Sequence, residues 1–236
     1  MNLYIRTIRS VIKAYPAVIP HLKGRARWVA FASGGEYKTY DYYLQQLTRL
    51  ITSVYNNNLN GEFIDIMANL IQGQIYQAVN QAWLDSGMDG SLPDYLVSLA
   101  DDIVLGQYEH VDQLYRDIVD ARLDGTPLAP LLARAPLWAT RWTEAYNQAM
   151  LLIAAEMGQR MVWELGATEQ HCETCAALNG IVAFASEWEE LGVMPQSAPN
   201  DALQCGGWKC DCKLTPTEQR RSPDAYGRIM NATVKL

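Results

Sequence analysis

The sequence predicts a mainly α-helical protein, with a helical N-terminal body and a small C-terminal α+β module that is zinc-knuckle-like. Apolar residues recur at helical spacing from about residue 37 to 165. After Gly166, short apolar pieces alternate with glycines, prolines and cysteines. We therefore divide the 236 residues into a basic N-terminal arm (1–36), a helical body (37–165) and a cysteine-rich module (166–236).

The body is predicted to be a set of amphipathic helices. Apolar spacing places these helices at about 43–54, 62–84, 94–106, 108–123 and 136–165. Ser91 is expected to cap the third helix, and Pro136 to open the last one. Trp138, Trp142 and Ala145 recur at the spacing of an amphipathic helix, which indicates core packing rather than an aromatic ligand site.

Shorter elements are expected after residue 166. Residues 181–184 should form a strand after the Asn179–Gly180 turn, and Lys213 and Leu214 should belong to another strand. Ser186 is placed to cap a short helix that ends near residue 191. A segment this short buries little apolar surface, so a structural metal would contribute much of its stability.

Charge is distributed unevenly along the chain. The net charge of -7 and the pI near 5.0 argue against a general nucleic-acid coat. Residues 85–124 hold ten acids against Arg116 and Arg122. Residues 1–27 hold no acid and six bases, which are candidate contacts for nucleic acid or an acidic protein surface: Arg6, Arg9, Lys13, Lys23, Arg25 and Arg27. An alternative is a helix over about 3–15 with the first three of these bases facing water.

Neither a membrane span nor secretion is expected. The longest apolar run, around 150–155, is far shorter than the roughly 20 apolar residues that a spanning helix needs. Near the N-terminus, Arg6, Arg9 and Lys13 interrupt the apolar residues, so no separate hydrophobic region of a signal peptide follows.

The cysteines point to a metal site. All five lie in the last third of the chain, and their odd number and clustering favour a metal over a disulfide framework. The two-residue knuckle at 172–175 and a second group some 30 residues later can supply four thiolates to a tetrahedral zinc ion. The candidate ligands are four of Cys172, Cys175, Cys205, Cys210 and Cys212, with His171 in reserve. Thiols without metal, and a redox pair or disulfide, remain the alternatives.

Two enzymatic interpretations use the same residues. His171 and Glu173 fit the first half of a zinc deaminase signature, but the downstream Pro-Cys-x-x-Cys half is missing. A thioredoxin-like role for Cys172 and Cys175 requires a preceding strand in a βαβ unit, whereas a long helix is expected there. Hydrolase and nucleotide-binding motifs are also missing, so we expect neither enzymatic activity nor a small-molecule substrate.

Several motifs occur together in the C-terminal part. They are Arg-Trp-Thr-Glu-Ala at 141–145, Trp-Glu-Leu-Gly at 163–166, His-Cys-Glu-Thr-Cys at 171–175, Leu-Asn-Gly at 178–180 and Cys-Asp-Cys-Lys-Leu at 210–214. In this order they resemble the tailed-phage minor head proteins of the Mu F-like head morphogenesis family. That family commonly has His-Pro-Asn before the closing Cys-x-Cys, and here Cys205 and a Gly-Gly-Trp-Lys spacer occupy the region. Cys205 would then replace the histidine as a ligand.

The resemblance implies a minor structural protein of capsid assembly. It would bind portal, scaffold or capsid subunits, lie in the virion at the head interior or portal region, and pass through the host cytoplasm during assembly. The basic arm would contact packaged DNA or the portal, and structural Zn2+ would be the metal-binding module's cofactor. A zinc-containing nucleic-acid-binding protein is the alternative, followed by a zinc-dependent or thiol-redox enzyme.

Overall fold

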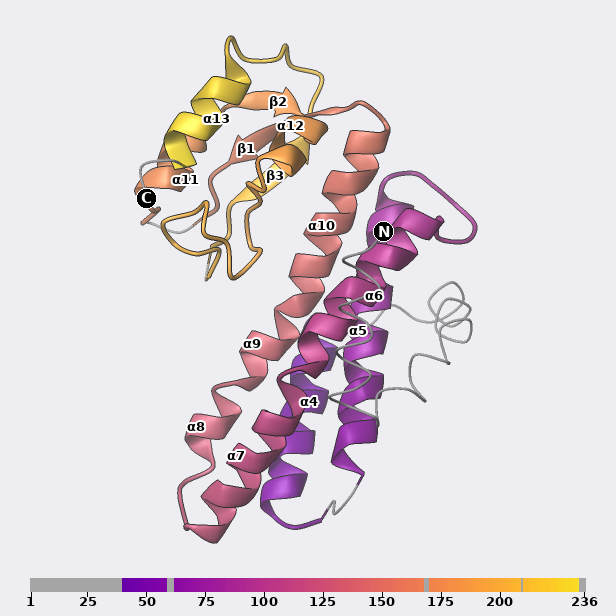
Figure 1. Cartoon of the computed structure of the whole chain (residues 1–236), viewed down its shortest axis with the longest axis vertical. Helices are drawn as coiled ribbons and strands as arrows, with labels where there is room; N and C mark the ends of the chain where they lie inside the picture. The colour runs from indigo at the N-terminus through magenta and orange to yellow at the C-terminus, as the bar shows by residue number, and fades with distance from the viewer. Residues whose placement is uncertain (1–39, 59–61, 168–169, 209, 234–236) are drawn as a thin grey trace. The chain divides into compact units, whose positions relative to one another are not determined.

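The computed structural model describes residues 40–58, 62–167, 170–208 and 210–233 (Figure 1). The predicted basic arm lies outside the described residues, together with its candidate contacts Arg6, Arg9, Lys13, Lys23, Arg25 and Arg27. Within the described ranges, no helix combines the length and apolar character needed to cross a membrane.

The described chain forms two compact units. Unit 1 comprises residues 40–81 and 89–142, and unit 2 comprises residues 82–88 and 143–233. The predicted start of the cysteine-rich module at 166 therefore lies inside unit 2. The reason is that residues upstream of 166, among them Leu151, Met161 and Trp163, are buried in the same hydrophobic core as the cysteines.

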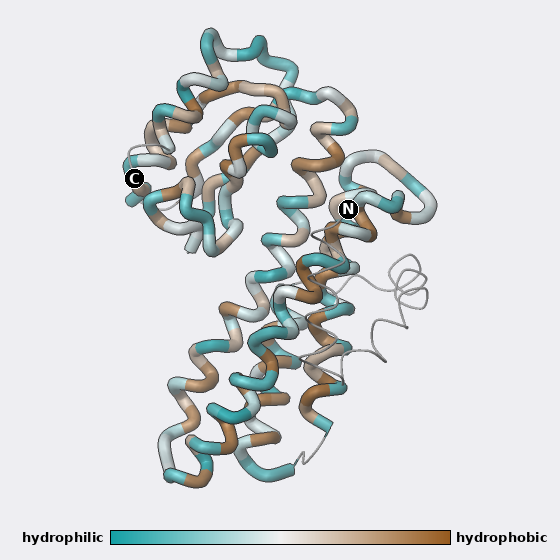
Figure 2. Tube along the Cα trace, in the orientation of Figure 1, coloured by the Kyte–Doolittle hydropathy of each residue, from teal (hydrophilic) through white to brown (hydrophobic). Residues whose placement is uncertain are grey.

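Unit 1 is helical. Its elements are α4 (Tyr40–Tyr55), α5 (Phe63–Asp85, whose last turn belongs to unit 2), α6 (Asp94–Tyr108), α7 (Val111–Leu123), α8 (Ala129–Leu132) and α9 (Ala135–Ala139). The predictions of helices at about 43–54, 62–84, 94–106 and 108–123 are confirmed. Helix α4 packs against α7, α8 and α9. Figure 2 shows hydrophobic and hydrophilic residues alternating along these helices, as expected when one side of each helix is buried.

Helix α5 is buried along most of its length and carries polar side chains into the core. Gln72, Gln74 and Gln77 are each less than 5% exposed. The Gln74 amide donates to the backbone carbonyls of Trp138 and Ala139, at 3.0 and 2.6 Å, and Gln77 accepts a 2.9 Å hydrogen bond from the Tyr43 hydroxyl. Since an unpaired buried amide is costly, these bonds specify how α4 and α9 lie against α5.

Helix α6 begins without the predicted side-chain cap. Asp94 is its first residue, so Pro93 occupies the N-cap position and makes no side-chain capping bond. The prediction that Ser91 caps this helix is therefore wrong. Ser91 lies two residues too early for its hydroxyl to take the N-cap role.

The single helix predicted over 136–165 is also wrong. The segment divides into α9, α10 (Arg141–Glu156) and strand β1 (Arg160–Glu164). Gly158 ends α10 in the left-handed conformation (φ +62°), and the Gln159 N–H donates to the Ala154 carbonyl, which is the pattern of a glycine-terminated helix. Trp138 and Ala145 are buried, as the packing interpretation of their spacing predicted.

Unit 2 is an α+β module around a three-stranded antiparallel sheet. After α10 and β1 come α11 (Glu173–Leu178), β2 (Val182–Phe184), α12 (Ala185–Glu190), β3 (Lys213–Pro216) and α13 (Ala225–Thr233). The strand order is β2-β1-β3, and Val162 pairs with Val182 on one side and Thr215 on the other. Helix α13 packs against α11 and β2 (Figure 1). The predicted fold class, mainly α with a small C-terminal α+β module, is confirmed.

Two tryptophans form the centre of the unit 2 core. Trp163 of β1 and Trp188 of α12 are both fully buried, with ring centroids 5.7 Å apart. The Trp188 indole N–H donates to the Met161 carbonyl at 3.4 Å. Cys175 and Cys212 belong to the same core cluster. The core and the thiols are thus parts of one packed structure.

A bidentate ion pair attaches α12 to the segment before α13. Arg221 donates from Nε and Nη2 to the two carboxylate oxygens of Glu187, at 2.9 and 2.5 Å, and Glu187 also accepts the Phe184 N–H at 2.9 Å. Phe184 is the N-cap residue of α12, so the predicted capping role of Ser186 is wrong. Hydrogen bonds from Arg221 hold the pKa of Glu187 below its ordinary value.

We expect Glu187→Gln to remove a pH-dependent part of the stability of unit 2. Because the folded-state pKa of Glu187 is lowered, its contribution is fully present above about pH 4.5 and is lost as the pH falls through the lowered pKa. At pH 7 the variant should lose about 1–2 kcal/mol of unfolding free energy, and the difference from the native chain should shrink in acid. Urea unfolding at several pH values measures both.

Glu218→Gln is the matched control for this prediction. Glu218 pairs with Arg160 at 3.6 Å, but its side chain is fully exposed, so the substitution should leave the unfolding free energy almost unchanged at every pH tested. Equal effects of the two substitutions would contradict the role assigned to the Glu187 ion pair.

Candidate metal centre

The first two thiols are positioned by the start of helix α11. Cys172 is the N-cap residue of α11, and its sulfur accepts the Cys175 N–H at 3.4 Å. Three residues of separation in the first turn bring both side chains to one face of the helix. The predicted knuckle is therefore a helix cap in which a thiol takes the role usually played by a hydroxyl or carboxylate.

The other three thiols come from the chain before β3. Cys205 precedes two left-handed glycines, Gly206 (φ +61°) and Gly207 (φ +75°), and Cys210 and Cys212 follow them. A Cβ atom on Gly207 would lie 2.5 Å from the Ser197 carbonyl oxygen. These glycines turn the chain back so that the second group of thiols reaches α11.

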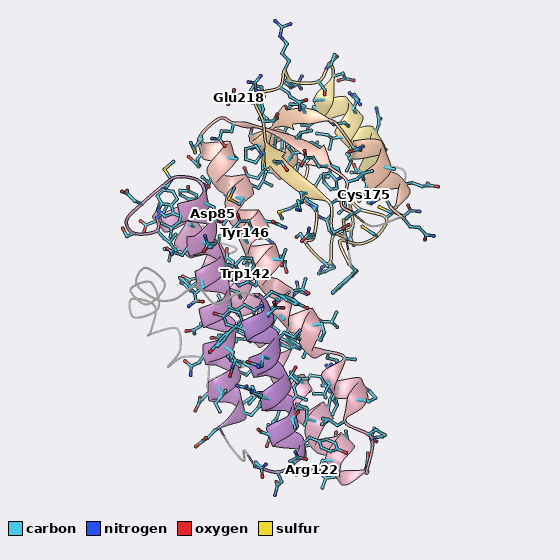
Figure 3. The ribbon with its side chains drawn as sticks, turned by 180° about the vertical axis from the view of Figure 1, so that it is seen from behind. Asp85, Arg122, Trp142, Tyr146, Cys175 and Glu218 are labelled. Carbon is cyan, nitrogen blue, oxygen red and sulfur yellow. The ribbon has the colours of Figure 1, made fainter. Side chains whose placement is uncertain are left out.

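The five sulfurs converge on Cys175, which Figure 3 labels among the side chains of unit 2. Cys172, Cys175 and Cys205 form one group with all sulfurs within 4.8 Å of one another, and Cys175, Cys210 and Cys212 form a second such group. The sulfurs of Cys175 and Cys210 are 3.9 Å apart, close to the roughly 3.8 Å edge of a tetrahedral zinc–thiolate site. We name these five residues the cysteine cluster. The cluster could hold a metal ion.

All five cysteines are free thiols, and none forms a disulfide bond. Cys175 and Cys212 are each 1% exposed, while the other three are half-buried. His171, the reserve ligand, places Nδ1 3.9 Å from the sulfur of Cys212. The structure therefore brings the five predicted thiol ligands together and places His171 beside one of them.

Backbone N–H groups point at four of the five sulfurs. Cys172 accepts the Cys175 N–H at 3.4 Å. Burial acts to raise the pKa of Cys172, Cys205 and Cys212, and nearby backbone N–H groups act against burial at these three sulfurs and also lower the pKa of Cys210. Each such bond lowers the pKa of the accepting thiol because it stabilises the thiolate. The loops thus supply the hydrogen bonds that surround metal-bound sulfur in proteins.

The thiols also act on one another. The Cys175 thiol, which donates to Cys210, lowers the pKa of Cys210 to about 5. Burial, together with the neighbouring thiols, raises the pKa of Cys205 to about 11. Without a cation, only some of these packed thiols can ionise. Binding of a divalent ion would release the remaining protons, so metal affinity should rise with pH.

Gly166 and Asp211 form a close contact beside the cluster. A Cβ atom on Gly166 would lie 2.1 Å from the Asp211 carboxyl carbon and 2.4 Å from the Asp211 carbonyl oxygen. Asp211 also accepts the Ala167 N–H at 2.8 Å. Sequence reasoning treated Gly166 only as a helix stop and did not find this role. The position of Asp211 between two candidate ligands was the available signal.

Two further hydrogen bonds join the halves of the cluster. Gln204 accepts the Glu173 N–H at 2.8 Å, and the Gln204 N–H donates to the Thr174 hydroxyl at 3.3 Å. The sequence did not indicate that Gln204 would take part. The two bonds hold the residue before Cys205 against the first turn of α11.

The local fold bears on the thioredoxin-like interpretation. The element before Cys172 is strand β1, so the expectation that a long helix precedes the knuckle is wrong. However, β1 pairs antiparallel with β2, whereas a βαβ unit requires parallel strands. Glu173, the residue of the deaminase interpretation, is exposed at the start of α11.

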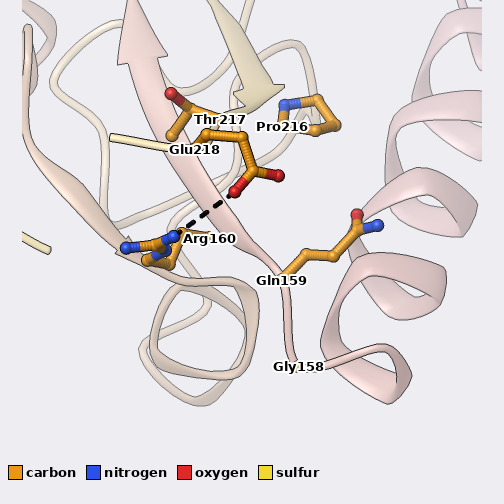
Figure 4. A pocket seen from close by; sticks show the side chains of 6 residues that line it. All are labelled: Gly158, Gln159, Arg160, Pro216, Thr217 and Glu218. Carbon is orange, nitrogen blue, oxygen red and sulfur yellow. Dashed lines mark ion pairs between the residues drawn. The ribbon is translucent and has the colours of Figure 1, made fainter. Parts of the chain in front are cut away.

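A separate hollow of about 330 Å3 lies on unit 2 between the start of β1 and the end of β3 (Figure 4). Gly158, Gln159 and Arg160 line one side, and Pro216, Thr217 and Glu218 line the other. No cysteine of the cluster lines it. Arg160 and Glu218 pair with each other across the hollow at 3.6 Å, so their charges largely compensate there.

Comparison with protein-family models, with curated proteins and with solved structures finds no match to this chain. The cysteine cluster, the fold around it and the motifs of the sequence are therefore the features that bear on function.

We expect Gly166→Ala to weaken metal binding about 10–100-fold, because the added methyl group would push Asp211 and the adjacent Cys210 and Cys212 out of place. Competition with a chromophoric chelator measures the affinity. Gly106→Ala is the control, since nothing lies within 4 Å of the position of its Cβ in helix α6. Equal metal affinity in the two variants would contradict the role assigned to Gly166.

Proposed function

We propose that this chain is a minor head protein of a tailed phage whose C-terminal unit is held folded by structural zinc at the cysteine cluster. The convergence of five thiols from two distant segments on Cys175 is the observation that carries the metal part. The resemblance of residues 141–216 to Mu F-like head morphogenesis proteins supports the assembly part. The motifs of that resemblance lie almost entirely in unit 2, at its core and around its thiols.

Zinc is the metal that the donor set favours. Thiolate sulfur is a soft ligand, and tetrahedral sites rich in cysteine select zinc or iron–sulfur clusters among the common metals of proteins. The small sheet of unit 2 has three short strands, so a metal that joins α11 to the chain before β3 would add folding energy where the core is small.

The unit would act by binding rather than by catalysis. A small unit held rigid by a bound metal ion is suited to bind portal, scaffold or capsid subunits during head assembly. DNA is not expected to bind to the acidic segment 85–124, because its negative charges repel the phosphates of DNA. The six bases of residues 1–27 are the part of the chain suited to packaged DNA or to an acidic portal surface.

We expect one or more zinc ions per chain, and chelation should open unit 2 to protease while unit 1 stays folded. Cys175→Ser should do the same, because Cys175 belongs to both groups of thiols. Limited proteolysis followed by mass spectrometry locates the cuts, which should fall in unit 2 and leave unit 1 intact. Glu218→Gln is the control in the same unit. Protease resistance of residues 166–216 in both the chelated chain and the variant would contradict the structural role of zinc.

The assembly role is tested on phage heads. In a phage that encodes this chain, purified heads should contain it at a few copies per head, and cross-linking should join it to the portal, scaffold or capsid subunit. Virions that lack the chain entirely, with normal heads formed after deletion of its gene, would contradict the proposal. Binding to free DNA that weakens steeply with salt, and weakens less steeply after charge reversal at Arg25 and Arg27, would favour the nucleic-acid-binding alternative.

A further inference from the structure

The cysteine cluster holds more sulfur than one tetrahedral ion can use. One ion takes four donors, whereas five thiols converge and His171 lies next to Cys212. We propose that the cluster binds two metal ions that share the Cys175 thiolate as a bridging ligand. This inference rests on the proposed metal site and adds to it the number of ions and the assignment of each thiol.

The arrangement of the sulfurs supports a shared ligand. Among the described residues, the sulfurs lie in two groups of three, and Cys175 is the thiol common to both. In a tetrahedral zinc–thiolate site, neighbouring sulfurs are about 3.8 Å apart. Three sulfurs within 4.8 Å of one another would need to move together only slightly to bind one ion. Each group of three sulfurs can therefore bind one ion, and because the two groups share the Cys175 sulfur, this sulfur would bridge the two ions.

Each ion then has its own ligands. The first is bound by Cys172, Cys175 and Cys205, with a solvent molecule as the fourth ligand, since Cys172 and Cys205 are only half-buried. The second is bound by Cys175, Cys210 and Cys212. His171 is the candidate for its fourth ligand, because its Nδ1 is 3.9 Å from the Cys212 sulfur, and it would have to move toward the other two sulfurs to bind the same ion.

The surroundings of the thiols support two ions as well. In the first group the Cys175 N–H donates to the Cys172 sulfur at 3.4 Å, and in the second group the sulfurs of Cys175 and Cys210 lie 3.9 Å apart. A single ion bound to four cysteines would leave a fifth thiol unused, although that thiol is placed as the others are.

Charge is compatible with two ions. When all five cysteines are ligands they carry five negative charges, and two divalent cations compensate these charges more completely than one cation does.

Native mass spectrometry of the zinc-loaded full chain counts the ions directly. Two zinc ions per chain are expected. One zinc ion would overturn the inference and leave the structural zinc of the proposed function in place. No bound zinc would overturn both, and so would iron with acid-labile sulfide in its place.

Cadmium substitution tests the bridge itself. The chain loaded with 113Cd should give two NMR signals that split each other, because scalar coupling passes through a shared sulfur. Two signals without splitting would contradict the bridging role of Cys175, even with two ions bound.

Single substitutions test the assignment of the ligands. Cys212→Ser and Cys205→Ser should each lose one ion and keep the other, since each thiol belongs to one group only. His171→Ala is a milder change at the second site and should lower the affinity for one of the two ions at least 10-fold. Thr217→Ala, which lies outside the cluster, should keep both ions. Loss of both ions in His171→Ala, or of none in Cys212→Ser and Cys205→Ser, would overturn the assignment.

Discussion

The convergence of two distant chain segments on the Cys175 sulfur is the constraint on which the C-terminal unit depends. Cys175 lies in the first turn of α11 and belongs to the core that Trp163 and Trp188 share. From the other direction, the loop before β3 delivers Cys205, Cys210 and Cys212 to the same place. One buried sulfur therefore joins the apolar core to the loops, and the arrangement of the other four thiols around it follows from that junction.

Core packing and thiol packing have complementary roles in unit 2. The two tryptophans are fully buried and pack against each other, and the strands themselves are short. A sheet of this size buries limited apolar surface, so the loops need another source of order. Close contacts at Gly166 and Gly207 bring these loops together. A metal ion bound by the thiols would hold the loops against helix α11.

The helices of unit 1 were predictable because their signals are local. Apolar spacing and glycine or asparagine stops locate α4, α5, α6 and α7 to within a few residues. The failures also have local causes. In the segment after Pro136, Gly158 ends the helix and Arg160–Glu164 forms a strand, although the apolar spacing continues through both. A strand that is buried on both faces, as β1 is, has no alternation to reveal it.

By itself the sequence determined the helical character of the chain, the place of the cysteine-rich module and the set of candidate ligands, since periodicity and cysteine spacing are properties of the chain alone. Only the tertiary structure decided which sulfurs meet and that Cys175 is common to both groups. It also decided that Gly166 must lack a side chain beside Asp211. These features depend on contacts between residues some 30 to 45 positions apart, and such distances are set by how strands and loops pack in space.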